Sequence, residues 1–510
     1  METQNKKENI RQRAYLNSVT AWIDTIVKLI VRFIIDPFII SFLGGFYYGI
    51  WQIINQLNSY LATTDLRAAT ALKWIIAKDR TTKSEYELKQ SVSSSLYTNF
   101  IFLPLYLITG AIIVYYVPYI TKVSSEDFFL VRKTSAIMVL AFIITQIFFL
   151  FESVLHGMNL SYKRLGIRSI ITILGGVFTF ILLSCGFSID GLAIVNVFIA
   201  LATGLTFALI VKKIVPWFGF VKVRFNQIMS FAKLSGWFMI DKIVNLLNES
   251  IDLILLGYFA SAQYVTMYTI SRFTIQAVSS IYRSGQGAIV PGITRFLGEN
   301  KFDKIIYFRK SMIIMNWFVL GIFGSVIILL NRSFIGLWTN QDYFAGSYET
   351  FLIVLLALLK SLYSIDDSII TMNLNLKKKI IISAISALMT IIMSIILIPQ
   401  FHIIGLLISL IIGLLLRMVI FSSIAKDIVN GSNFIPNLFF SRISLFSLFI
   451  LGISTYLSQY IMVDKWFNLF LYAFFYLLLI VPLYWFMGLN KLNRDFLIEN
   501  LRRIKPTKLD

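Results

Sequence analysis

The chain has 510 residues, of which 57% are hydrophobic and only 14% are charged, and its formal net charge is +20. Soluble globular domains do not reach this apolar content, so the composition predicts a polytopic membrane protein. The single cysteine, Cys185, excludes an intrachain disulfide, and with only two histidines in the chain we expect no metal centre and no cofactor.

The first apolar stretch carries a line of ionisable side chains. Asp24, Lys28, Arg32 and Asp36 recur at every fourth position, and each step of four turns a helix by about 400°, so they lie on one slowly drifting stripe. A charge that faces hydrocarbon costs at least about 2.5 kcal/mol, which predicts that the stripe faces a bundle interior or a wet cavity. A plainer interpretation is that the charges only pair, Asp24 with Lys28 and Arg32 with Asp36, and the two interpretations are compatible. The other face is apolar and suits lipid: Trp22, Ile23, Ile26, Val27, Ile30, Val31 and Ile34.

Stretches of about twenty apolar residues predict fourteen spanning helices along the chain. They cover residues 15–36, 48–72, 94–117, 134–156, 167–185, 190–212, 232–256, 264–290, 311–331, 350–372, 379–398, 402–424, 440–461 and 466–488. Lys and Arg gather in every second connection, as expected of cytoplasmic loops, while the intervening loops are short or nearly free of positive charge. The first fourteen residues are polar and basic and no cleavage site follows, so we expect the N-terminus in the cytoplasm. The alternation of the loops returns the basic C-terminal tail to the same side. The net charge then reflects orientation and contact with anionic lipid, and no nucleic-acid partner is expected.

The chain also repeats itself. At an offset of 216 residues Asp36 aligns with Asp252, Tyr48 with Tyr264 and Arg67 with Arg283; at 214 Glu152 aligns with Asp366, Lys163 with Lys377 and Gly191 with Gly405. We therefore predict an all-α transporter of two parallel six-helix repeats, related by an axis along the membrane normal, with two further C-terminal helices. The predicted parts are a cytoplasmic N-terminus (1–14), an N-lobe (15–212), a linker (213–231), a C-lobe (232–425), two added helices (440–488) and a basic cytoplasmic tail (489–510).

Several short stretches resemble one family of membrane proteins. They are Leu255-Leu256-Gly257 followed by Tyr264, the counterpart Ser41-Phe42-Leu43-Gly44 followed by Tyr47-Tyr48-Gly49, and Met372-Asn373-Leu374 with the basic run that leads to Ile403-Ile404-Gly405-Leu406. They are similar to the Wzx-type polysaccharide biosynthesis flippases of the multidrug/oligosaccharidyl-lipid/polysaccharide exporter superfamily. One departure is that the first copy has Ser41 where the second has Gly257.

The resemblance implies a V-shaped pair of six-helix lobes with a central cavity, in a bacterial cytoplasmic membrane. It implies movement of an undecaprenyl-pyrophosphate-linked glycan from the inner to the outer leaflet by alternating access, for O-antigen of lipopolysaccharide, for capsule or for exopolysaccharide. Its partners would be that glycan, membrane lipids, and polymerase and export proteins of the same pathway.

Cationic side chains on corresponding helices of the two copies are candidates for the anionic headgroup, because a diphosphate that crosses hydrocarbon needs charged partners and the fork of arginine suits phosphate oxygens. The candidates are Lys28, Arg32 and Arg67 in the first copy and Lys242, Arg272 and Arg283 in the second. Arg67 and Arg283 occupy the same place in the repeat. The alternative for these two is that they snorkel to the cytoplasmic surface.

Six acids on the same helices balance the six bases: Asp24, Asp36, Asp65, Asp241, Glu249 and Asp252. An arriving pyrophosphate unbalances this set, which favours coupling to a proton or sodium ion at Asp24, Glu249 or Asp252. The membrane potential is an alternative driving force, since it favours export of an anion. Glu152, Asp366 and Asp367 are interpreted as interfacial charges at cytoplasmic helix ends.

No phosphate-binding loop, metal cluster or large soluble domain is evident, so we expect no enzyme activity. Two other classes remain as alternatives. A multidrug or cation antiporter of the same superfamily would have a cavity dominated by carboxylates and aromatics. A glycan polymerase would have a large extracytoplasmic loop, whereas the longest outer segments here are only residues 122–132 and 332–349. A peptidoglycan-precursor flippase is a near neighbour that the sequence does not separate from the other glycan exporters.

Overall fold

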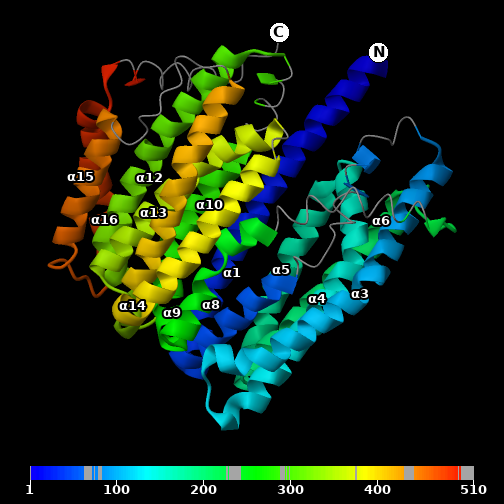
Figure 1. The fold of residues 1–510 in the computed structure, drawn as a ribbon, viewed down its shortest axis with the longest axis horizontal. Helices are drawn as coiled ribbons and strands as arrows, with labels where there is room; N and C mark the ends of the chain where they lie inside the picture. Colours follow the sequence, from blue (N-terminus) through cyan, green and yellow to red (C-terminus); the bar gives the residue numbers. More distant parts are fainter. Residues whose placement is uncertain are drawn as a thin grey trace. The chain divides into compact units, whose positions relative to one another are not determined.

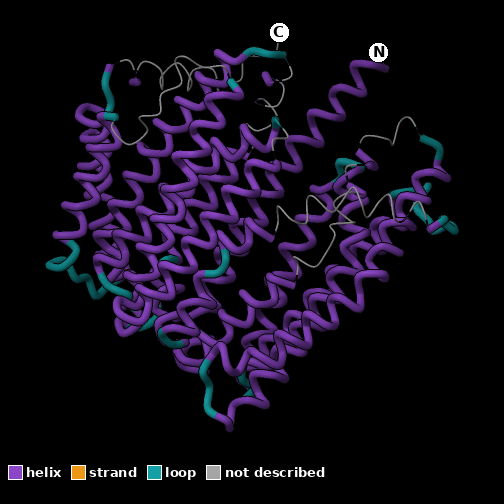
Figure 2. Tube along the Cα trace, viewed as in Figure 1, coloured by secondary structure: helices purple, strands orange, loops and turns teal. Residues whose placement is uncertain are grey.

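A computed structural model describes residues 2–61, 72–73, 75–77, 83–225, 228, 243–287, 293, 296–297, 299–373, 376–429, 441–491 and 493–494. In these ranges every regular element is a helix and no strand occurs (Figure 2). Seven helices of the described part are long and apolar enough to cross a membrane. The predicted all-α polytopic class is therefore confirmed.

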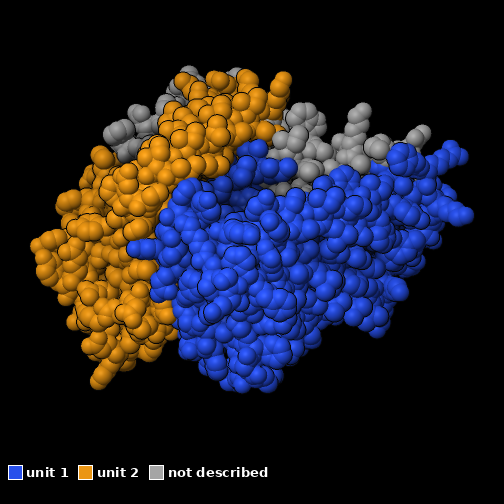
Figure 3. Space-filling model, turned by 60° about the horizontal axis from the view of Figure 1, so that its bottom comes forward, with its two compact units in different colours: residues 1–265 blue, residues 266–510 orange. Residues whose placement is uncertain are grey.

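The chain forms two compact units, residues 1–265 and 266–510 (Figure 3). Unit 1 contains α1 (Glu2–Leu61), α3 (Glu85–Thr121), the short η1 (Ser125–Asp127), α4 (Phe128–Gly157), α5 (Ser161–Ser184), α6 (Ile189–Ile214) and α8 (Asp252–Phe259). Helix α4 packs between α3 and α6, and α1 packs along α5 (Figure 1). The lobe boundaries expected from the repeat remain a prediction.

Small residues allow the close approach of the helices beside α4. A Cβ atom on Gly204 of α6 would lie 2.2 Å from the ring of Phe148, and one on Gly110 of α3 would lie 2.6 Å from the side chain of Val139. Helices in a membrane associate through such packing, since lipid tails are as apolar as the side chains themselves. Glycine at these two positions therefore brings α3 and α6 against opposite sides of α4.

Unit 2 is built around one long helix. Its elements are α9 (Ala262–Ser271), which crosses the unit boundary, α10 (Phe273–Gly287), α12 (Phe302–Trp338), η2 (Gln341–Tyr343), α13 (Ser347–Met372), α14 (Leu376–Ile428), α15 (Arg442–Leu457), α16 (Trp466–Leu483) and one π-helical turn, η3 (Tyr484–Gly488). Helix α12 contacts α10, α13, α15 and α16, and its buried residues occur on all its faces. A helix that is apolar all round is expected at such a centre.

Two predicted pairs of spans each form one helix that is interrupted at a single residue. The break in α1 is at Gly44 (φ 78°, ψ 164°) and the break in α14 is at His402 (φ 46°, ψ −117°). In α14 the Ser386 hydroxyl donates to the carbonyl of Gly413 at 2.7 Å, and a Cβ on Gly405 would lie 2.3 Å from the carbonyl oxygen of Leu397. The arms of α14 therefore run antiparallel, and the predicted loop between them is reduced to a tight turn.

Asn159, and Gly257 of the family resemblance, each have a structural role in unit 1. Asn159 has φ 59° in the turn between α4 and α5, a conformation that asparagine adopts more readily than most residues, and its side chain accepts a hydrogen bond from Asn17 of α1 at 2.7 Å. Gly257 has a different role from Gly44, since a Cβ there would lie 2.4 Å from Ile53 of α1. Gly44 permits a turn, whereas Gly257 permits close packing of α8 on α1.

Candidate functional site

The ionisable stripe of α1 forms two ion pairs. Lys28 Nζ lies 2.5 Å from Asp24 Oδ2, and Arg32 Nε lies 2.9 Å from Asp36 Oδ2. The acidic side chains are only 7% and 8% exposed, whereas those of Lys28 and Arg32 are 42% and 36% exposed. The predicted pairing is confirmed, and it buries the acids while it leaves the bases accessible.

The surroundings of the stripe also follow the sequence pattern. Trp22, Ile26, Ile30 and Ile34 are exposed along the other side of α1, as a face against lipid should be. Tyr48, on the second arm of α1, is fully buried beside the Arg32–Asp36 pair. The two arms of α1 therefore approach each other at this pair.

The remaining candidate cations divide between described and undescribed parts of the chain. Arg67 and Lys242, like Asp65 and Asp241, lie outside the described residues, so their place in an anion site stays a prediction. In unit 2 the guanidinium carbon of Arg272 lies 4.5 Å from the centroid of the Tyr268 ring. Arg283 on α10 is exposed and has no hydrogen bond or ion pair within the described part of the chain.

The candidate coupling acids have different environments. Asp24 belongs to an ion pair, and its Oδ1 has no hydrogen-bond partner among the described residues. Asp252 is buried at the start of α8, where its carboxylate accepts a hydrogen bond from the backbone of Leu253 at 2.9 Å and lies near Tyr60. Glu249 is exposed. Of the three, only Asp24 and Asp252 are buried.

The interfacial interpretation of Asp366 is wrong. Its carboxylate is buried and accepts two hydrogen bonds from Arg309 of α12, from Nε at 2.6 Å and from Nη2 at 3.0 Å. Arg309 Nη2 also lies 3.2 Å from the Ser422 hydroxyl of α14. Next along α13, Asp367 pairs with the buried Lys379 at 2.9 Å. The predicted spans 264–290 and 311–331 left Arg309 in the connection between them, whereas it lies buried within α12.

A cavity of about 430 Å³ lies inside unit 1, between α1, α4, α5 and α6. Nine of the eighteen described residues that line it are polar or charged, so it is not a gap left by imperfect packing of apolar side chains. These nine are Asn55, Asn58 and Ser59 of α1, Thr145, Gln146 and Glu152 of α4, Arg168 of α5, and Asn196 and Thr203 of α6. Four phenylalanines complete much of the wall: Phe142, Phe148, Phe149 and Phe207. Its volume lies in the range of ligand pockets.

Several polar groups of this cavity have no partner among the residues that the structure describes. Asn58 Oδ1 and Thr203 Oγ1 are buried and make no hydrogen bond to any described residue. The half-buried side chain of Arg168 makes no hydrogen bond or ion pair in the same part of the chain. Buried polar groups are nearly always paired with protein, water or ligand. The side chain of Arg168 is available to an occupant, whereas Asn58 Oδ1 and Thr203 Oγ1 themselves have almost no accessible surface. Sequence analysis missed the cavity, although the spacing of Asn55, Asn58 and Ser59 on one helix face was a signal for it.

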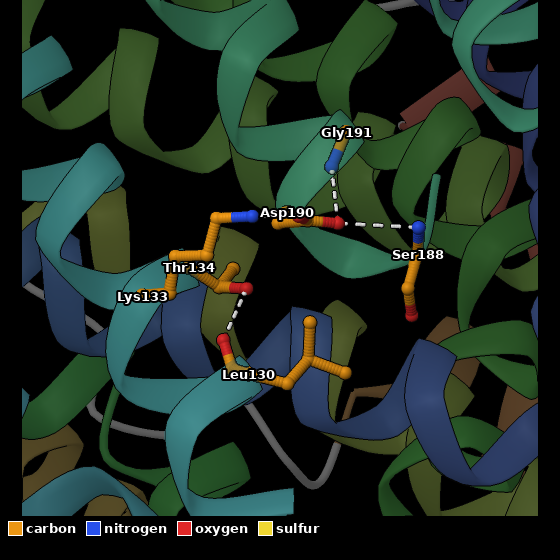
Figure 4. A network of polar contacts seen from close by, with 6 residues as sticks. All are labelled: Leu130, Lys133, Thr134, Ser188, Asp190 and Gly191. Carbon is orange, nitrogen blue, oxygen red and sulfur yellow. Dashed lines mark hydrogen bonds and ion pairs between the residues drawn. The ribbon is translucent and has the colours of Figure 1, made fainter. Parts of the chain in front are cut away.

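A polar network holds together the ends of the two helices that supply most of the lining (Figure 4). Lys133 Nζ of α4 lies 2.7 Å from Asp190 Oδ2 at the start of α6. The other carboxylate oxygen of Asp190 accepts from the backbone N–H groups of Ser188 at 3.2 Å and Gly191 at 3.0 Å. Asp190 thus satisfies N–H groups at the helix start and links α6 to α4.

Comparisons with known proteins identify the fold. No family model and no curated protein matches the chain. Among solved structures, the lipid II flippase MurJ in an inward closed conformation is similar to this chain. The match covers 92% of this chain and 99% of the MurJ chain, with a TM-score of 0.66 and 17% sequence identity. An inward-facing multidrug resistance MATE family transporter of the MOP superfamily matches 80% of this chain over 96% of its own, with a TM-score of 0.57 and 11% identity.

A third similar structure is a MOP superfamily transporter from Pyrococcus furiosus, described by the reverse polarity of its binding pocket. It matches 81% of this chain over 95% of its own, with a TM-score of 0.52 and 14% identity. At these identities the likeness concerns the fold alone. This chain has the fold of the multidrug/oligosaccharidyl-lipid/polysaccharide exporter (MOP) transporters, as the sequence resemblance implied.

Proposed function

We propose that this chain is a flippase that moves a polyprenyl-pyrophosphate-linked oligosaccharide from the inner to the outer leaflet of a bacterial cytoplasmic membrane. The glycan would serve a cell-surface polysaccharide, and later proteins of the pathway, including a polymerase, would take it up. The fold supports a transporter, and the similar structure with the highest TM-score quoted above is a flippase for a lipid-linked precursor. The Wzx-like stretches of the sequence favour a polysaccharide precursor as the cargo.

One observation carries this proposal. On α1 the acids are buried and the bases are accessible, so the stripe presents positive charge to whatever lies beside it. A pyrophosphate is an anion that must be shielded from hydrocarbon, and the planar guanidinium fork of Arg32 suits phosphate oxygens. Lys28 adds a compact positive charge one turn away.

A multidrug or cation antiporter is the second candidate, and the likeness to MATE transporters favours it. Such a protein needs an accessible carboxylate for its cation. Each acid of the α1 stripe instead has a base one turn along the helix that neutralises it. A glycan polymerase is disfavoured, since the described connections at residues 122–127 and 339–346 are short.

Coupling to a proton or sodium ion remains part of the proposal, with Asp24, Glu249 and Asp252 as carriers. The amide variant of the true carrier should lose the dependence of transport on a pH or sodium gradient. Unchanged dependence in all three variants would leave the membrane potential as the driving force.

Depletion of the protein in its native host tests the function. We expect the lipid-linked glycan of one surface polysaccharide to accumulate on the inner leaflet while its surface polymer disappears. Unaltered surface glycans together with a new sensitivity to cationic drugs would overturn the flippase proposal in favour of the antiporter.

A further inference from the structure

We propose that the cavity inside unit 1 is a carbohydrate site that binds an uncharged pyranose ring. The inference rests on the proposed function, because it assigns to this cavity the sugar that a lipid-linked glycan carries. It is separate from the cationic stripe of α1, which we assign to the pyrophosphate. Headgroup and sugar would thus have different partners in the same unit.

The lining has the hydrogen-bonding chemistry that a pyranose requires. Each hydroxyl of a sugar both donates and accepts, and side-chain amides offer a donor and an acceptor on one group. Asn55, Asn58, Gln146 and Asn196 supply four amides from three helices. Thr203 adds a hydroxyl to this lining, and a hydroxyl, like an amide, can both donate and accept.

The aromatic residues suit the apolar faces of the same ligand. A pyranose ring presents C–H groups above and below its plane, and the negative face of an aromatic ring attracts such positively polarised edges. Phe142, Phe148 and Phe149 of α4 and Phe207 of α6 line the cavity together with the amides. A wall that combines amides and aromatic rings matches a molecule with polar edges and apolar faces.

The charges and polarity of the lining disfavour other occupants. Among the described residues the lining has one acid, Glu152, and one base, Arg168, so this part of the lining carries no formal net charge that would select an anion or a cation. An isoprenoid chain is disfavoured because half of the lining is polar. An uncharged, hydroxyl-rich ligand makes use of both charged groups, since hydroxyls donate to Glu152 and accept from Arg168.

The dimensions favour a short, linear portion of glycan. The lining of α4 extends from Met138 to Glu152, which at the helical rise of about 1.5 Å per residue is about 21 Å. A cavity of 430 Å³ with this extent is narrow. It therefore suits one or two rings in a row, and the branches of a larger oligosaccharide would stay outside.

Cysteine protection tests the site directly, since Cys185 is exposed and is the only cysteine of the chain. In a Cys185→Ser background, Thr203→Cys places a thiol in the cavity. Thr206→Cys is a matched control on the same helix, because Thr206 is absent from the lining and its hydroxyl bonds its own helix at Ala202. The rate of reaction with a small methanethiosulfonate reagent is measured on the purified protein with and without added ligand.

The probes are methyl glucoside, methyl galactoside and N-acetylglucosamine, with sodium pyrophosphate as the anionic comparison. We expect at least one of the sugars to slow labelling at position 203 by about threefold or more, with no change at position 206. Asn58→Leu in the Thr203→Cys protein should raise the sugar concentration for half protection by about threefold to tenfold, the effect of one lost hydrogen bond.

Three results would overturn the inference: protection by pyrophosphate alone, equal protection at both positions, or no protection by any sugar. The outcome is separable from that of the proposed function. If sugars protect position 203 in a protein that flips no lipid-linked glycan, the carbohydrate site stands and the flippase proposal is refuted. If the protein flips such a glycan and no sugar protects position 203, the flippase proposal stands and the carbohydrate site is refuted.

Discussion

Arg309 of α12 and Asp366 of α13 form a two-pronged ion pair inside unit 2, with N–O distances of 2.6 and 3.0 Å. Both side chains are buried, and the Ser422 hydroxyl of α14 lies 3.2 Å from the same guanidinium. The pair therefore joins three helices at one point. Removal of one partner leaves the other as a buried, unpaired charge, which in proteins costs about 3–5 kcal/mol.

We accordingly predict that Asp366→Asn and Arg309→Met each lower the melting temperature of the purified protein strongly. Arg309→Lys keeps the charge and loses only the fork, so it should lower the melting temperature less. The double variant Arg309→Met/Asp366→Leu should regain most of the loss, because no charge is then left buried. The exposed pair of Lys301 and Glu299 provides the control, since Lys301→Gln should change stability by less than about 1 kcal/mol. A double variant no more stable than either single one would contradict this explanation.

The network at the start of α6 gives a graded prediction. Asp190→Ala loses both the contacts to backbone N–H groups and the ion pair to Lys133, and we expect it to destabilise the protein by about 1–2 kcal/mol. Lys133→Gln loses only a pair whose lysine is largely accessible, so we expect less than about 1 kcal/mol. Thermal unfolding followed by size-exclusion chromatography gives the order. If both variants were equally destabilised, the backbone contacts of Asp190 would be unimportant.

Glycine at the turn of α14 permits a close approach of two backbones. We predict that Gly405→Ala disrupts unit 2, because the new Cβ would lie 2.3 Å from the carbonyl oxygen of Leu397 and main chain cannot move aside easily. Gly452→Ala in α15 is the matched control, since its Cβ would meet nothing within 4 Å. Alanine there should be neutral or stabilise the helix by up to about 1 kcal/mol. Similar yields of folded protein from both variants would show that the turn adjusts without cost.

The parts of this structure that are repeated along the sequence could be predicted from it. Regular spacing of residues within a single stretch of sequence predicts the apolar spans, the exposed face of α1 and the pairing of Asp24 with Lys28. The pair of Arg309 and Asp366 could not be predicted, because 57 residues separate its partners and each was interpreted from its own neighbours. The cavity was missed for the same reason, since its polar lining comes from four helices that each contribute a few residues.

Arg283 offers a clean test of contact with the headgroup. It is exposed and has no partner in the described part of the chain, so its replacement should leave stability unchanged. If it binds phosphate oxygens, Arg283→Ala should weaken headgroup binding by about tenfold to a hundredfold. The affinity of Arg283→Lys for the headgroup should lie between those of Arg283→Ala and the wild type. The same order is predicted for Arg67. If the arginine instead only snorkels to the surface, the lysine variant should bind the headgroup as the wild type does and the alanine variant nearly as well.

The most direct test of the central claim is transport by the purified protein in liposomes. A polyprenyl-pyrophosphate-linked sugar with a fluorescent label is placed in both leaflets, and dithionite, which does not cross the membrane, bleaches the label outside. Our account predicts that, with wild-type protein in the liposomes, dithionite bleaches all of the label. Arg32→Glu, which reverses the accessible charge beside Asp36, should leave the inner-leaflet label protected, as should liposomes without protein. A wild-type protein that leaves the inner-leaflet label protected while it exchanges a cationic drug for protons would contradict the account.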